Sequence, residues 1–113
     1  MSALDRVSAW APVVLWAAMI FVFSSIPDLS TGLGAWDAVA RKVLHVGEFA
    51  VLAALCLRAI GRPLAAAVLA SLYAALDEVH QSFVEGRTGS PLDWAIDSFG
   101  VVIGILALLA ATR

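Results

Sequence analysis

The stretch WAIDSFGVVIGILALLAA, residues 94–111, decides the fold. A helix needs about 20 predominantly apolar residues to cross a bilayer, and Asp97 is the one charged residue in this stretch. Ser90-Pro91-Leu92-Asp93, just before it, is typical of a helix N-cap. Gly100 and Gly104 form a GxxxG motif, which allows helices to pack closely in a membrane. Because Asp97 shares the face of these glycines, its carboxylate is predicted to point into a helix bundle.

The composition of the whole chain also indicates a membrane protein. Of its 113 residues, 62% are hydrophobic and 14% are charged. Soluble domains carry about 25% charged residues, and a soluble globule this small could not hide so much apolar surface. The net charge is -2 and there is no basic run, so no nucleic-acid partner is predicted. The single cysteine, Cys56, can form neither an internal disulfide nor a CxxC metal site.

Three further apolar segments precede the quoted stretch. The predicted spans are residues 9–23, 39–57, 63–81 and 94–111. The third reaches spanning length only if Asp77, Glu78 and Gln81 belong to its helix. The connections are short and contain helix-breaking glycine and proline, so consecutive helices must be antiparallel neighbours. The sequence therefore predicts an all-α fold, an integral membrane four-helix up-down bundle, as a single domain over residues 1–113.

The basic residues indicate an orientation for this bundle. Four spans place both termini on one side of the membrane. The basic residues of that side are Arg6, Arg58, Arg62 and Arg113. Those of the other side are Arg41, Lys42 and Arg87. Because basic residues are enriched in cytoplasmic segments, this small bias predicts cytoplasmic termini.

Polar residues within the spans gather at a common depth. Asp77 lies fourteen residues beyond Pro63, which is ~21 Å along a helix that rises about 1.5 Å per residue. Because the hydrocarbon core is about 30 Å thick, Asp77 should lie inside the outer leaflet. The same calculation from the other span ends gives a similar depth for His45, Glu48 and Asp97. We call the predicted set the polar layer, and its members are Lys42, His45, Glu48, Asp77, Glu78, Gln81, Asp93 and Asp97.

These residues, in this order, resemble the VanZ-like family of bacterial membrane proteins. The matching pieces are Phe23-Ser24-Ser25, Lys42 with His45, Phe49 and Leu52, Tyr73 to Glu78 with Gln81, Gly86-Arg87, and Asp93, Asp97, Gly100 and Gly104. Two positions depart from the family pattern. Arg41 stands where the family usually has aspartate, and Asp97 stands where it usually has asparagine. The role of the family asparagine therefore cannot be carried over unchanged.

The resemblance implies a multi-pass protein of the bacterial inner (plasma) membrane. The founding member of the family is associated with low-level resistance to teicoplanin, a glycopeptide antibiotic that targets cell-wall precursors outside the membrane. We therefore expect recognition or modification of an envelope lipid, or of a lipid-linked cell-wall precursor, at the outer leaflet. The expected partners are membrane lipids, including a lipid-linked ligand that contains phosphate.

Each polar residue has an expected role in this interpretation. The candidate catalytic residues are His45, Glu48 and Glu78, one of which transfers a proton if a reaction takes place. The candidate binding residues are Lys42, Asp77, Gln81, Arg87, Asp93 and Asp97. Lys42 and Arg87 are expected to contact phosphate, because charged donors bind its oxygens strongly. Asp93 and Asp97 would hold the cations in place, and Gln81 would orient a neighbour by hydrogen bonds.

Other interpretations of the same residues stay open. The polar layer can be a structural network or a docking feature for a partner, in which Asp77 accepts from Lys42 or from a backbone amide. It can also be part of a lipid-flipping or transport path. His45 and Glu48, three residues apart, could bind a divalent metal together with Glu78 and Asp93 or Asp97. No metal and no other cofactor is assigned from the sequence, and whether the protein is an enzyme is left open.

Overall fold

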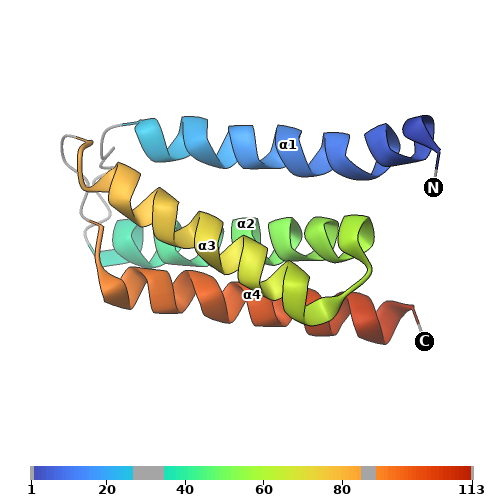
Figure 1. Ribbon diagram of the computed structural model, residues 1–113. Helices are drawn as coiled ribbons and strands as arrows, with labels where there is room; N and C mark the ends of the chain where they lie inside the picture. Colours follow the sequence, from blue (N-terminus) through green and yellow to red (C-terminus); the bar gives the residue numbers. More distant parts are fainter. Residues whose placement is uncertain (1, 27–34, 85–88, 113) are drawn as a thin grey trace.

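The computed structural model describes residues 2–26, 35–84 and 89–112 (Figure 1). Over these residues the chain forms four α-helices and no strand. They are α1 (Ala3–Ser25), α2 (Ala35–Ile60), α3 (Pro63–Gln81) and α4 (Pro91–Ala111). Each helix runs antiparallel to the one before it, so that the start of α1 and the end of α4 lie at the same end of the molecule. The predicted all-α, four-helix up-down bundle is confirmed.

The two ends of the bundle differ in what they contain. The end with both termini and the α2–α3 turn at Gly61 is called the terminal end below, and the opposite one the polar end. α1, α2 and α4 are each long and apolar enough to cross a membrane. α3 has 19 residues and includes Asp77, Glu78 and Gln81 in its last turns. α3 is not among the helices found apolar enough to cross a membrane, because its last turns carry these polar residues.

Capping groups explain where the helices begin and end. α1 begins at Ala3 rather than at the predicted residue 9, because Ser2 Oγ accepts the Asp5 N–H and Asp5 Oδ2 accepts the Ser2 N–H. Counting apolar residues alone missed this capping box. The predicted start of α4 is confirmed by the cap, since Ser90 Oγ accepts the Asp93 N–H at 3.0 Å.

α2 extends beyond the predicted residues 39–57 at both ends. Its last turn continues through Arg58 to Ile60, where the sequence predicted a turn. Gly61 then takes a φ of 77° and donates its N–H to the Leu57 carbonyl at 2.7 Å. Only glycine adopts this left-handed conformation without strain, and it commonly ends a helix in this way.

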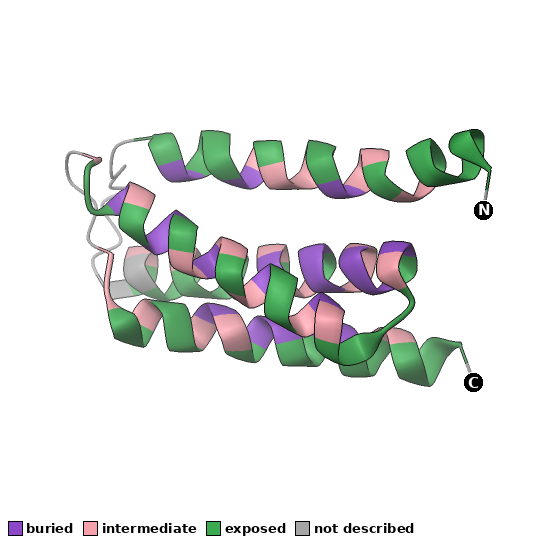
Figure 2. Ribbon diagram, viewed as in Figure 1, coloured by how far each residue is buried: buried purple, intermediate pink, exposed green. Residues whose placement is uncertain are grey.

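Small residues bring the helices together, and large apolar residues cover the outside. Ala66, Ala70 and Ala74 lie along one face of α3 and are completely buried. α2 and α3 each contact all three other helices. Large side chains such as Leu15 on α1 and Leu76 on α3 are 70% and 67% exposed. Figure 2 shows exposed residues along the outer faces of the helices. An outer surface this apolar fits lipid rather than water.

The GxxxG motif fixes how α4 lies on α2. Gly100 packs against the backbone of Val46, and Gly104 packs against the backbone of Ala50. A Cβ atom at either glycine would overlap a carbonyl oxygen of α2, so the two helices approach more closely than larger residues would allow. This contact directs Asp97, less than one turn before Gly100, toward the part of α2 that carries His45.

Candidate functional site

Three acidic side chains are buried near the polar end of the bundle. Asp77 and Glu78 on α3 are 4% and 7% exposed, and Asp97 on α4 is 2% exposed. Ionised groups at membrane depth cost several kcal/mol unless they are paired, and such residues often have functions. Their neighbours therefore decide both the stability and the chemistry of this region.

Gln81 connects Asp77 to the first helix. Its Nε2 donates to Asp77 Oδ2 at 2.9 Å, one turn earlier on α3, and also reaches Ser24 Oγ on α1 at 3.4 Å. Gln81 and Ser24 are both buried, at 5% and 1% exposure. This chain of side chains orients the Asp77 carboxylate and links α3 to α1.

Glu78 lies between α3 and the start of α4. Its Oε2 accepts the N–H of Ser90, the N-cap residue of α4, at 3.3 Å. The Glu78 and Asp97 carboxyl groups are also close enough to form a hydrogen bond when one of them carries a proton. With both groups ionised, Asp97 Oδ2 has no hydrogen-bond donor among the described residues.

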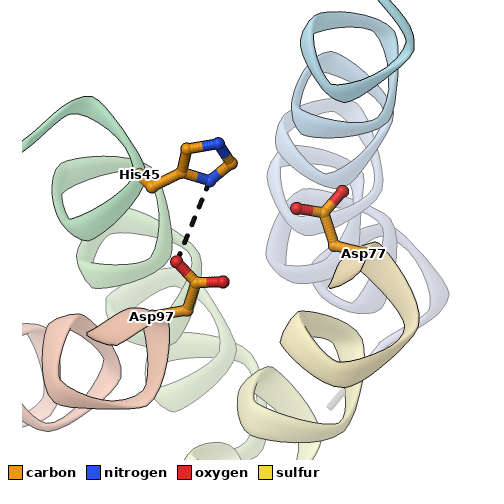
Figure 3. A group of neighbouring side chains, drawn as sticks. All are labelled: His45, Asp77 and Asp97. Carbon is orange, nitrogen blue, oxygen red and sulfur yellow. Dashed lines mark ion pairs between the residues drawn. The ribbon is translucent and has the colours of Figure 1, made fainter. Parts of the chain in front are cut away.

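His45 faces these carboxylates from α2. Its Nδ1 lies 3.8 Å from Glu48 Oε2 and 3.8 Å from Asp97 Oδ1. Both distances allow electrostatic attraction but exceed the usual length of a hydrogen bond. Figure 3 shows that His45, Asp77 and Asp97, from three different helices, point toward one another. One ligand-type atom from each of these three residues lies within 4.8 Å of the other two.

Lys42 and Asp93 form an ion pair at the rim of this cluster. Lys42 Nζ donates to Asp93 Oδ1 at 2.7 Å, with the two side chains 51% and 26% exposed. The pair is thus more accessible than the three buried acidic groups. A phosphate that approaches from the polar end would meet the Lys42 ammonium before it met the buried carboxylates.

Eight of the nine candidate site residues lie in the described part of the chain, and Arg87 lies outside it. The structure brings His45, Glu48, Asp77, Glu78, Gln81 and Asp97 into one buried or half-buried cluster. One expected contact was wrong: Asp77 accepts from Gln81, not from Lys42 or a backbone amide. Lys42 lies on a part of α2 that faces the first turn of α4, and there it pairs with Asp93 instead.

The sequence interpretation missed the contribution of α1. Ser24 and Ser25 were named only as part of the family resemblance and were assigned no role in the polar layer. Ser25 Oγ donates to the Phe21 carbonyl at 2.8 Å, but it also lies 2.8 Å from His80 Nε2, and the His80 ring stacks on Phe21. Ser24 meets Gln81. The Phe23-Ser24-Ser25 element of the resemblance was the available signal for these contacts, since apolar patterning alone gives no reason for them.

An apolar groove of about 650 Å³ follows the first half of α3, at the other end of the bundle. Its lining runs from Gly61 to Leu72 and contains no acidic residue. Arg62 is the one charged residue of this lining, and the buried acidic groups lie at the opposite end of the helices.

Comparison with known proteins gives a match at the level of a family. The model of the VanZ/LLP1 family matches residues 8–112, which is nearly the whole chain. Neither the comparison with curated proteins nor that with solved structures gave a match.

Proposed function

The chain belongs to the VanZ/LLP1 family, and we propose that it recognises or modifies an envelope lipid, or a lipid-linked cell-wall precursor, at the outer leaflet of the bacterial inner membrane. The observation that carries this proposal is the convergence of half-buried His45 with buried Asp77 and Asp97 near one end of an apolar bundle. Ionisable groups are rare at this depth because of their cost, and where they occur within membrane spans they commonly mark a functional site. The association of the family with teicoplanin resistance fits a target that is a wall precursor.

The positive-inside rule supports an orientation with cytoplasmic termini. Arg58 lies in the last turn of α2 at the terminal end, and Arg62 precedes α3 there. If this end faces the cytoplasm, the polar end faces the outer leaflet. A headgroup at that leaflet would then lie at the level of the polar layer, with its acyl chains along the apolar outer surface of the bundle.

The proposed roles divide the polar layer into a rim and a centre. Lys42, together with Arg87, contacts the phosphate of the ligand, because both can donate charged hydrogen bonds to its oxygens. Asp93 positions Lys42 through the 2.7 Å ion pair. In the centre, His45, Glu48 and Glu78 are the groups able to take or give a proton if a reaction occurs. Gln81 orients Asp77.

A second candidate is a structural role for the same residues. The Asp77–Gln81–Ser24 contacts favour it, because they join two helices through buried polar groups. A transport path is less well supported. Toward the terminal end the described core consists of apolar residues such as Leu52, Cys56 and Ile105, which offer no polar continuation of the layer.

The first test compares the lipids and wall precursors of cells with and without the protein. Loss of the protein should change the amount or the headgroup of one lipid or lipid-linked precursor, as measured by mass spectrometry, and should lower survival in teicoplanin. Plasmid-borne wild-type protein should restore both. Identical lipid and precursor profiles in the two strains would contradict the proposal.

Substitutions at the centre then separate function from structure. Variants His45→Ala and Glu78→Gln should fail to restore the wild-type lipid profile, although each variant protein accumulates in the membrane at the wild-type level. Thr112→Val, which removes a hydroxyl at the opposite end of α4, is the control and should restore it fully. If His45→Ala and Glu78→Gln accumulate normally and restore the wild-type lipid profile as well as the control does, the polar layer is a structural network.

A further inference from the structure

We infer that His45, Asp77 and Asp97 hold a divalent transition-metal ion, because one imidazole and two buried carboxylates from three helices converge on one point (Figure 3). The use of this ion rests on the proposed function, which the inference deepens. The binding of the ion is independent of the proposed function, since binding can be measured without any lipid.

The spacing of the donor atoms is close to what one ion requires. Ligand atoms that each lie about 2.0–2.2 Å from a zinc ion are roughly 3.4 Å apart in tetrahedral geometry. In the structure His45 Nδ1 and Asp97 Oδ1 are 3.8 Å apart, and all three donor atoms lie within 4.8 Å of one another. The three donors are therefore from a few tenths of an ångström to about 1.4 Å farther apart than in a bound site, and binding would draw them together.

A second observation at Asp97 points to a ligand independently of the acidic cluster. Asp97 is 2% exposed, yet its Oδ2 has no hydrogen-bond donor among the residues that the structure describes. Its carboxyl group points toward Asp77 and His45 (Figure 3). A buried carboxylate oxygen without a donor costs free energy, and coordination of a cation removes that cost.

Neighbouring residues hydrogen-bond to the proposed ligands and fix their orientation. Gln81 Nε2 donates to Asp77 Oδ2 at 2.9 Å and fixes the orientation of that carboxylate. Glu78 lies beside Asp97 and is itself held by the Ser90 N–H at 3.3 Å. Glu78 is therefore placed to accept a proton from a water molecule or ligand bound to the ion.

Charge balance favours a cation over further neutral contacts. Asp77, Glu78 and Asp97 are three buried acidic groups, and Lys42, the nearest lysine in the layer, is engaged with Asp93 at the rim. A divalent ion offsets two of these charges at once. The competing arrangement is a proton shared by Glu78 and Asp97, and it makes a different prediction, because it requires no metal.

The donor set indicates which ions suit the site. Imidazole favours zinc and its neighbours among the transition metals, whereas carboxylates are also good ligands for manganese. Three protein ligands leave a position open in a tetrahedral site, as in catalytic rather than structural zinc sites. In the context of the proposed function, a phosphate oxygen of the lipid ligand would occupy that position.

The test uses the full-length protein purified in detergent. After extraction with a chelator and dialysis, the protein is titrated with ZnCl₂ and with MnCl₂ by calorimetry, and bound metal is measured by mass spectrometry. We expect about one ion per chain. Asp97→Asn and His45→Ala should each weaken binding by at least about 100-fold. Gln81→Ala should weaken it by about 10–100-fold, because Gln81 only orients the Asp77 carboxylate. Asp5→Asn, at the opposite end of the bundle, is the matched control and should bind as the wild type does.

X-ray absorption of the zinc-loaded wild type provides a readout that does not depend on any variant folding. It should show one imidazole and oxygen ligands at about 2.0–2.1 Å and no sulfur. Wild-type protein that binds neither metal, or that shows sulfur ligation by Cys56, would overturn the inference and favour the shared proton. Those results would leave the proposed lipid function standing, since the comparison of cellular lipids tests it separately.

Discussion

Asp93 and Asp97 lie one turn apart on α4 but in very different surroundings. Asp93 is in the first turn, partly exposed, and paired with Lys42 at 2.7 Å. Asp97 is almost completely buried and faces His45 across 3.8 Å. Lys42 can therefore exchange Asp93 for a phosphate ligand at low cost, whereas any change at Asp97 alters the buried centre of the polar layer.

This difference predicts a weak coupling between Lys42 and Asp93. Because the side chains are 51% and 26% exposed, the pair should be worth about 0.2–1 kcal/mol, as exposed ion pairs usually are. A double-mutant cycle with Lys42→Met and Asp93→Asn, measured by unfolding in mixed micelles, gives this energy. A coupling of several kcal/mol would mean that Lys42 is locked in place, and would contradict its proposed role in binding phosphate.

Single-residue roles were only partly predictable from the sequence. Helical rise and phase depend on residue number alone, so they could bring His45, Asp77 and Asp97 to one depth. The partner of each side chain depends on helix rotation and tilt, which short-range patterns do not determine. For this reason Gln81 was expected to orient a neighbour, but its partners Asp77 and Ser24 could not be named, although all three residues were part of the motifs.

At the scale of the helices, the contact between α2 and α4 sets the geometry of the site. Gly100 and Gly104 place the α4 backbone directly against Val46 and Ala50. His45 precedes Val46, and Asp97 lies three residues before Gly100, so the two glycines determine the distance between imidazole and carboxylate. The GxxxG motif predicted this close packing, but it could not name α2 as the partner helix.

Two glycines with opposite surroundings test whether α4 packs closely on α2. A Cβ atom at Gly104 would overlap the Ala50 carbonyl, whereas one at Gly47, on the exposed face of α2, would meet nothing within 4 Å. Gly104→Ala should therefore lower the free energy of unfolding by about 1–3 kcal/mol, as overpacked cores do. Gly47→Ala should leave it unchanged or raise it by up to about 1 kcal/mol, because alanine favours the helix.

Unfolding of both variants in mixed micelles measures the difference. Equal effects of Gly104→Ala and Gly47→Ala would show that α4 does not rest on α2 in the way described. Loss of stability in Gly47→Ala alone would point to a contact on the outer face of α2 instead.

At the scale of the whole molecule, the bundle is apolar outside and polar at one internal level. α1 contacts α2 and α3 through specific groups, since Trp16 Nε1 donates to the Glu48 carbonyl and the Tyr73 hydroxyl donates to the Ala17 carbonyl. It makes no comparable contact with α4 in the described part of the chain. The helix count and the up-down order were predictable because hydropathy and short connections determine them. The exact ends of α1 and α2 were not predictable, because capping geometry extends these helices past their apolar segments.

The central claim, that side chains of three helices meet at one buried level, is tested most directly by solid-state NMR of the protein in lipid bilayers. The sample carries ¹⁵N in the histidine rings and ¹³C in the aspartate carboxyl groups, and dipolar dephasing reports the distance between them. The 3.8 Å separation of His45 Nδ1 and Asp97 Oδ1 predicts strong dephasing. The dephasing should weaken in the Asp97→Asn variant and vanish in the double variant that carries both Asp97→Asn and Asp77→Asn. Absence of dephasing in the wild-type protein, or dephasing that persists in the double variant, would contradict the account.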